Sequence, residues 1–231
     1  TGLVGGQIPL GEILLSTERM RAIRDLTPYD DVIVAEAGCT LAAVHAVVTY
    51  PDKHFLRPSE FTPSLLEEGL GAALDLVRRA APANPGMRHV SVCCNHMLPA
   101  GASLVHPHLQ VFGGEAVPWL VGLYWDRSAH WLSRHGRSYW ETLVEQEKSS
   151  GERYVWGVAG VHWLVPFAPA GAREAIAVVP QVARLTDLDD EHTAALAHGP
   201  TRILTWYEDE GLSAFNFTLY GGPLTGRVTG F

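Results

Sequence analysis

Apolar residues recur along this chain with two different spacings, and each spacing predicts its own kind of element. Alternation of apolar and polar residues, rich in β-branched side chains, is typical of strands. An apolar residue at every third or fourth position is typical of a helix that buries one side. The first pattern predicts strands at residues 44–50, 88–94, 105–112, 154–158, 161–165, 174–179 and 213–220.

The second pattern is clearest after Thr62, which is followed by a proline, as at many helix starts. This helix is expected to end before Pro82, because proline disrupts a helix interior. Its buried stripe is expected to be Leu66, Leu70, Ala73, Leu74 and Val77. A second amphipathic helix is predicted at residues 189–207.

An aromatic stretch between these two helices repeats every four residues, at Trp131, His135, Tyr139 and Leu143. The repeat predicts a helical layer that packs against the sheet. Its solvated side is expected to carry Glu141, Glu145 and Glu147.

Residues 95–110, NHMLPAGASLVHPHLQ, form the stretch with the most chemistry, and we call it the signature. If residues 105–112 are extended, a period of two puts His106, His108 and Gln110 on one face. Pro107 has no N–H for a ladder and suits the start of a strand. The small residues before it, including Gly101 and Ser103, would let a phosphate approach backbone amides. Taken alone, two alternate histidines also fit two half-buried polar residues on a strand.

The signature resembles the active-site motif of galactose-1-phosphate uridylyltransferases, a branch of the histidine-triad superfamily. Asn, Gly-x-Ser and His-Pro-His-x-Gln occur in the order and spacing of that family. The resemblance implies a nucleotidyltransferase in which His108 carries a covalent nucleotidyl group and Gln110 assists catalysis. It implies that Asn95, Gly101 and Ser103 bind substrate, a UDP-sugar or a hexose 1-phosphate.

The same resemblance implies a structural zinc ion held by His54 and His106. His54 follows a Pro-Asp turn, as in that family, although Lys53 looks inserted before it. An exposed turn histidine is the equally simple alternative. The Cys-x-x-Cys pair of zinc-holding relatives is missing, and Cys39 is the one cysteine upstream of His54. Two histidines alone make a poor zinc site, because structural zinc takes four ligands.

The fold implied by the resemblance is α/β (α+β) and histidine-triad-like over residues 44–231. We expect a mainly antiparallel sheet with helices on one face, and strand 88–94 near strand 106–112. The last strand lacks the family's histidine, with Tyr220 in its place, and the domain is expected to be truncated. Members of the family are commonly dimers, so a homodimer is expected.

Residues 1–43 resemble a different family, the FAD-linked oxidases of the glycolate oxidase and D-lactate dehydrogenase type. A Gly-rich turn at residues 1–6 and a strand at 31–37 follow that family's order. Only the start of such a domain is matched, so FAD itself is not expected to bind. An FAD-linked oxidoreductase fragment and a non-catalytic fusion remnant stand as alternatives to the transferase, with the junction near Val44.

The composition says more about possible binding partners than about the fold. The 231 residues carry a formal net charge of −8, which argues against nucleic acid as a partner, because phosphate backbones select basic surfaces. Three cysteines do not make a disulfide framework, and Cys93 and Cys94 are expected to be small core residues. Because the cysteines form no disulfide framework, a reducing, cytoplasmic location is expected, and no apolar run is long enough to span a membrane.

Overall fold

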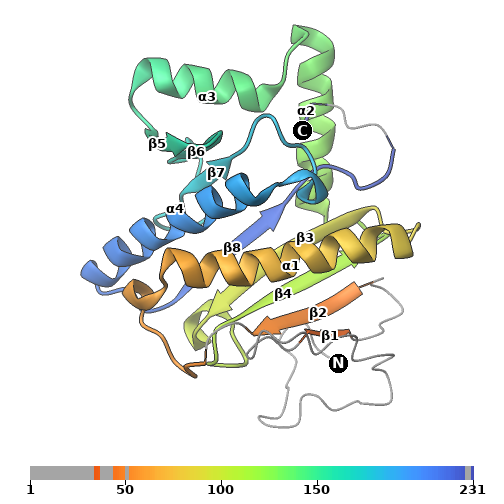
Figure 1. The fold of residues 1–231 in the computed structure, drawn as a ribbon. Helices are drawn as coiled ribbons and strands as arrows, with labels where there is room; N and C mark the ends of the chain where they lie inside the picture. Colours follow the sequence, from red (N-terminus) through yellow and green to blue (C-terminus); the bar gives the residue numbers. More distant parts are fainter. Residues whose placement is uncertain (1–33, 37–43, 50–51, 227–229) are drawn as a thin grey trace.

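The computed structural model describes residues 34–36, 44–49, 52–226 and 230–231, and its centre is a five-stranded antiparallel sheet (Figure 1). Every neighbouring pair of strands in this sheet is antiparallel, as predicted. The strands lie in the order β1 (Val34–Glu36), β2 (Val44–Thr49), β4 (His108–Gly114), β3 (His89–His96) and β8 (Phe215–Tyr220).

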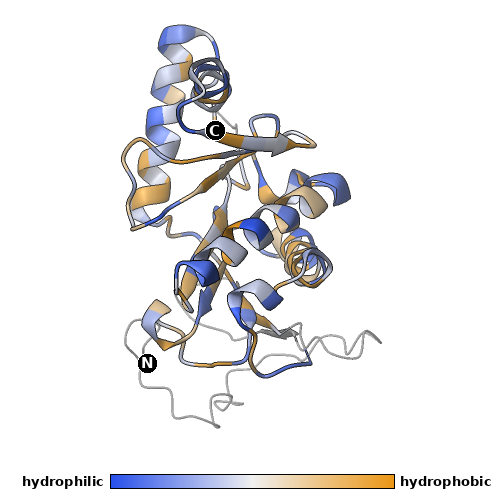
Figure 2. Cartoon of the chain, turned by 90° about the vertical axis from the view of Figure 1, so that its left-hand side faces the viewer, coloured by the Kyte–Doolittle hydropathy of each residue, from blue (hydrophilic) through white to orange (hydrophobic). Residues whose placement is uncertain are grey.

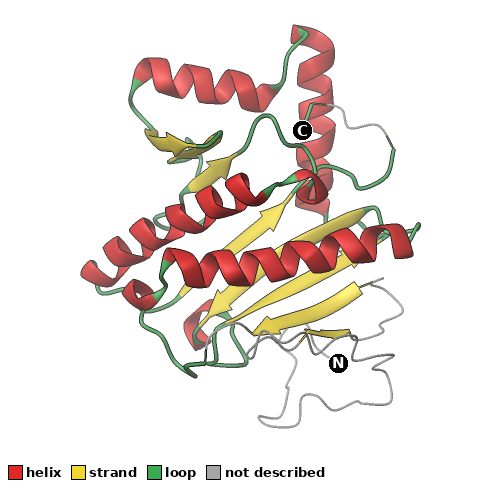
Figure 3. Cartoon of the chain, viewed as in Figure 1, coloured by secondary structure: helices red, strands yellow, loops and turns green. Residues whose placement is uncertain are grey.

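Helices α1 (Pro63–Ala83) and α4 (Asp190–Asp209) lie side by side over one face of this sheet (Figures 1 and 3). The hydroxyl of Thr62 accepts a hydrogen bond from the Leu65 amide at 3.3 Å, so the predicted N-cap is confirmed. The predicted end was wrong, because α1 continues through Pro82 to Ala83. A proline in the last turn removes one helical hydrogen bond there and leaves the preceding turns intact.

The core lies between this helix pair and the sheet. The most deeply buried side chains of the strands, Val48, Val92 and Val111, are 0% exposed, as are Leu74 and Val77 of α1. Burying such a side chain contributes about 1.5–3 kcal/mol each. Figure 2 shows hydrophobic residues along the strands, and helices that alternate between hydrophobic and hydrophilic residues.

A second region lies beyond one end of this core. It holds two helices, α2 (Trp119–His135) and α3 (Tyr139–Ser150), above the sheet in Figure 1. A three-stranded antiparallel sheet accompanies them, in the order β5 (Tyr154–Val158), β6 (Val161–Leu164) and β7 (Ile176–Val178). Single-turn helices complete the described chain at Pro58–Glu60 (η3), Leu98–Ala100 (η4) and Leu185–Asp187 (η5).

The helical layer predicted from the period of four is in fact two helices. Gly136 adopts a left-handed conformation, with φ of 72°, and ends α2 before α3 begins. The aromatic repeat survives the break, because the Trp131 ring lies 4.0 Å from the His135 ring and 5.4 Å from the Tyr139 ring. The spacing therefore reflected contacts between two helices as well as within one.

Glu147 is also not solvated, contrary to the prediction. It is 6% exposed, and its carboxylate accepts hydrogen bonds from Arg153 at 2.8 and 2.9 Å. The charge is tolerated there because a guanidinium that is itself half-buried neutralises it. No helix in the part of the chain that the structure describes is long and apolar enough to cross a membrane.

The segment predicted to resemble an FAD-linked oxidase lies outside the described residues, except for β1. This strand pairs with β2 in the register Val34 to Val48, so it extends the five-stranded sheet. The junction near Val44 and the oxidase resemblance therefore stay predictions.

Candidate functional site

The five-stranded sheet has a second face, opposite α1 and α4, and the signature lies on it. Leu109 and Val111 of β4 point into the core, so alternation turns His108 and Gln110 the other way. Residues from the neighbouring strands join them by register. Gln110 pairs with Cys93 of β3, and Asn95 follows two residues later on the same side. We call the surface formed by His108, Gln110, Cys93, Asn95 and Asn216 the polar face.

The strand that carries the two catalytic candidates is shorter than predicted. It begins at His108, so His106 precedes it and does not share its alternation. Pro107 sits at the junction, where a residue without an N–H interrupts no ladder bond. The prediction that His108 and Gln110 share one face is confirmed, and the predicted start of the strand was wrong, because His106 lies outside it.

His108 is held in one protonation form by the backbone beside it. Its Nδ1 lies 2.8 Å from the carbonyl oxygen of His106. A carbonyl only accepts, so Nδ1 carries the proton and donates it, and the lone pair of the neutral ring is on Nε2. The side chain is 4% exposed, and this burial lowers the pKa of His108, against the raising effect of the carbonyl. A neutral imidazole with its lone pair on Nε2 is the nucleophilic form.

The turn between β3 and β4 is tightly built. Gly101 has φ of 83°, a conformation that side chains rarely adopt, and its amide donates to the Leu98 carbonyl at 2.9 Å. The Ala102 amide likewise donates to the Met97 carbonyl at 3.2 Å. These amides serve the turn itself, so a phosphate near Gly101 would have to share them. The Ser103 side chain is exposed beside this turn.

His54 and His106 come together although 52 residues separate them in the chain. Their Nδ1 atoms are 3.0 Å apart, and the two rings meet edge to face at 4.8 Å. The expected proximity is therefore present. Among the residues that the structure describes, no third histidine, cysteine, aspartate or glutamate completes a metal-binding group with them.

Two polar residues, His96 inside the signature and Asn216 on β8, were missing from the predicted site. His96 is 1% exposed, packs against Phe61 and Phe215, and donates from Nε2 to the Leu56 carbonyl at 3.0 Å. It thereby holds the loop that carries His54. Asn216 of β8 donates to the side chain of Asn95 on β3 and to the Ala100 carbonyl in the turn. Its position in the alternation of strand 213–220 could have marked it as facing the signature.

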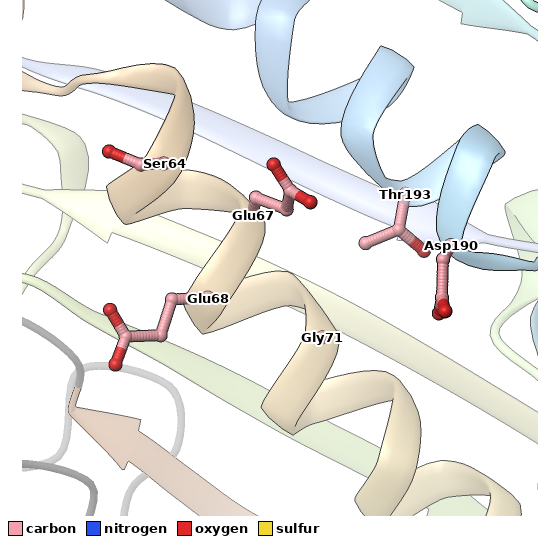
Figure 4. A pocket seen from close by; sticks show the side chains of 6 residues that line it. All are labelled: Ser64, Glu67, Glu68, Gly71, Asp190 and Thr193. Atoms are coloured by element: carbon pink, nitrogen blue, oxygen red, sulfur yellow. The ribbon is translucent and has the colours of Figure 1, made fainter. Parts of the chain in front are cut away.

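A separate hollow of about 380 Å³ lies between α1 and α4. Its lining includes Glu67, Glu68 and Asp190, and Figure 4 shows Glu67 directed toward Thr193 of α4 while Glu68 points away from α4. A hollow lined by carboxylates repels phosphates. It also lies in the helix layer, on the other side of the sheet from His108.

Comparison with known proteins decides which fold this is. No protein-family model matches the chain. A solved uridylyltransferase structure superposes with a TM-score of 0.73 at 23% identity, covering 81% of this chain and 62% of that one. The chain has the uridylyltransferase fold. This fold is the one that the signature predicted.

Two further structures share the fold. A GalT-like protein from Arabidopsis thaliana matches with a TM-score of 0.75 at 19% identity, covering 89% of this chain and 71% of that one. An ADP-glucose phosphorylase from the same plant, solved with bound ADP-glucose, matches with a TM-score of 0.74 at 18% identity, covering 88% and 69%.

One curated relative matches by sequence. An uncharacterized protein from Archaeoglobus fulgidus is 28% identical over 175 residues, which is 75% of this chain and 51% of that protein. The chain thus spans about half the length of this relative.

Proposed function

We propose that this chain is a nucleotidyltransferase domain that moves a nucleoside monophosphate between phosphates through a covalent nucleotidyl-His108. The observation that carries the proposal is the hydrogen bond from His108 Nδ1 to the His106 carbonyl. It leaves the Nε2 lone pair directed away from the backbone. The uridylyltransferase fold and the nucleotide sugar bound to a structural relative support the same reaction class.

In the first half-reaction, Nε2 of His108 attacks the α-phosphorus of a nucleotide sugar. A nitrogen–phosphorus bond forms, the bond to the leaving oxygen breaks, and a sugar 1-phosphate departs with the bonding electrons. The ring becomes a cation that keeps its Nδ1 proton. The His106 carbonyl, at 2.8 Å from Nδ1, stabilises that positive charge.

In the second half-reaction, an oxygen of an incoming phosphate attacks the same phosphorus. The nitrogen–phosphorus bond breaks, its electrons return to Nε2, and His108 is neutral again. The incoming group is a hexose 1-phosphate in a uridylyltransferase and inorganic phosphate in a phosphorylase. Splitting the transfer into two displacements lowers each barrier, because an imidazole is a better nucleophile than a phosphate oxygen.

The neighbours of His108 on the polar face would handle the phosphate oxygens. We propose that Gln110, one level along β4, donates its amide to the transferring phosphate, and that Asn95 donates from β3. Ser103, exposed beside the turn, would add a hydroxyl. Donors that point to where charge develops in the transition state are typically the largest contribution to such catalysis.

The proposal includes structural zinc, with His54 and His106 as two of its ligands. Tetrahedral ligands at about 2.1 Å from zinc lie roughly 3.4 Å apart, close to the 3.0 Å between the two Nδ1 atoms. Structural zinc takes four ligands, so the proposal needs two more, and Cys39, which lies outside the described residues, is one candidate. We expect bound zinc in the purified protein and none in His54→Ala, measured by plasma mass spectrometry. Zinc-free wild-type protein after zinc loading and dialysis would remove the metal from the proposal.

The test of the reaction uses UDP-glucose and ADP-glucose, each labelled at the α-phosphate. We expect wild-type protein to retain label in a bond that is labile to acid and stable to alkali, as a phosphoramidate is. His108→Asn should retain none. His106→Asn should still be labelled, and so should His198→Asn, a matched change at an exposed histidine of α4.

Two outcomes would contradict the proposal. Equal labelling of His108→Asn and wild type would move the nucleophile elsewhere. No labelling of the wild-type protein by either donor would remove the transferase function. If labelling occurs, adding glucose 1-phosphate, galactose 1-phosphate or inorganic phosphate to the labelled protein identifies the acceptor by which one discharges it.

A further inference from the structure

Asn216 lies on the last strand of the sheet, at the edge of the polar face. It pairs with Asn95 in the register of β3 and β8, so the two side chains are on the same side of the sheet. Cys93 pairs with Gln110, and this register places Asn95 at the level of His108. One strand, β3, therefore separates Asn216 on the edge strand from the proposed nucleophile on β4.

The hydrogen bonds of Asn216 determine how its own amide is turned. The side-chain nitrogen lies 2.7 Å from the carbonyl oxygen of Ala100. A backbone carbonyl only accepts, so the atom that faces it must be the NH₂ group. The hydrogen bond to Ala100 therefore shows which end of the Asn216 amide is nitrogen and which is oxygen. The shape of the amide could not show this, because the two ends are nearly identical in shape.

The orientation of Asn95 follows from that of Asn216. The same NH₂ group lies 2.7 Å from Asn95, so the Asn95 atom that faces it must be the oxygen Oδ1. The NH₂ group of Asn95 is then turned away from β8. The Asn216 side chain thereby fixes the orientation of the Asn95 amide. Through Ala100, it also contacts the turn that leads to Ser103.

We propose that Asn216 is a positioning residue for nucleotidyl transfer, because it compels Asn95 to present two N–H donors to the phosphate above His108. This inference rests on the proposed function. If the Asn95 amide were reversed, its oxygen would face the phosphate oxygens and repel them. Asn216 touches no reacting atom in this scheme and acts through Asn95.

The variant Asn216→Asp tests this with almost no change of shape. A carboxylate cannot donate to Asn95 Oδ1, so the Asn95 amide is expected to rotate and donate its NH₂ to the new carboxylate. We expect the maximal single-turnover rate of labelling to fall by about 100-fold, the loss typical of one misplaced transition-state donor. The substrate concentration at half-maximal rate should change by less than about threefold, because ground-state binding uses the other contacts.

A double-mutant cycle separates positioning from general disturbance. Asn95→Ala should lower the labelling rate about as much as Asn216→Asp does. The rate of the double variant should lie within about threefold of the rate of either single variant. The matched control is Asn84→Asp, which removes the 2.8 Å hydrogen bond that the Asn84 side-chain NH₂ donates to the Ala80 carbonyl at the end of α1. It should keep the wild-type rate. A rate for Asn216→Asp within twofold of wild type, or losses that multiply in the double variant, would overturn the inference.

A second measurement decides the matter if the wild-type protein transfers no nucleotide. The side-chain NH₂ signals of Asn95, assigned by their loss in Asn95→Ala, are followed by NMR while UMP is added. A shift of these signals in wild-type protein that is absent in Asn216→Asp supports the positioning role even if the transferase proposal has failed. Equal shifts in both proteins, or none in wild type, overturn it.

Discussion

The two faces of the five-stranded sheet are built from the same strands, yet their side chains differ in kind. Toward α1 and α4 the strands present Val48, Val92 and Val111, all without exposed surface. On the opposite side, the polar face presents the imidazole of His108, the thiol of Cys93, and the amides of Gln110, Asn95 and Asn216. Apolar packing explains the first face, because burial stabilises the fold. The polar face contributes less to stability, and its residues are better explained by chemistry.

His108 shows the difference most clearly. It is as buried as a core residue, but its ring carries nitrogen atoms, and burying a polar group costs stability unless it is hydrogen-bonded. One nitrogen is satisfied by the His106 carbonyl, and the other is the proposed nucleophile. A valine at position 108 would need no hydrogen-bond partner.

The largest expected effect comes from removing this imidazole. His108→Asn should lower the rate of nucleotidyl transfer by at least about a thousandfold, because no other group replaces the nucleophile. The melting temperature should stay close to that of the wild type, since one exchanged polar contact is small in a core of this size. Single-turnover labelling measures the transfer rate, and thermal unfolding measures the melting temperature. A large fall in melting temperature would assign His108 to the core instead.

A matched change on the helix-covered face should lower stability and leave the rate of nucleotidyl transfer nearly unchanged. Leu74 of α1 is 0% exposed, so Leu74→Ala should lower the free energy of unfolding by about 2–5 kcal/mol through lost burial and a cavity. The rate per folded molecule should stay within about twofold of wild type. Urea unfolding and active-site titration measure these quantities. A rate loss greater than the loss of folded protein would mean that the two faces are coupled.

Gln110 lies on the polar face two residues after His108 on β4. Gln110→Ala should slow the chemical step by more than about tenfold, or 1.4 kcal/mol, because the phosphate loses a donor in the transition state. Cys93→Ala, at the partner position on β3, is the neighbouring control and should have a smaller effect. An effect of Gln110→Ala below tenfold would mean that the glutamine is structural.

The smallest expected effect concerns acid stability at the helix-covered face. The pKa of Asp189 is lowered by hydrogen bonds from the backbone N–H and then the side chain of His192, at the start of α4. A lowered folded-state pKa adds stability above the unfolded pKa of about 3.9, and that stability is lost as the pH falls through the folded value. The melting temperature should therefore drop less between pH 5 and pH 3 in Asp189→Asn than in wild type. An identical drop would show that the cap does not contribute.

Local chemistry made much of the helix-covered face predictable. Thr62 followed by a proline, and a stripe of apolar residues behind them, were enough to predict α1, because caps and stripes act within one segment. The end of α1 was missed because a proline in a last turn costs little. The break at Gly136 was missed because Trp131 and Tyr139 keep the same spacing when they meet across two helices.

The order of residues in the signature, and the face that His108 shares with Gln110, follow from the amino-acid sequence alone, because a strand alternates regardless of what surrounds it. Three contacts depend on how the chain folds in three dimensions: His108 Nδ1 with the His106 carbonyl, His54 with His106, and Asn216 with the amide of Asn95. These contacts join positions up to 121 residues apart. Their geometry depends on strand order and register, and no local pattern of residues encodes either.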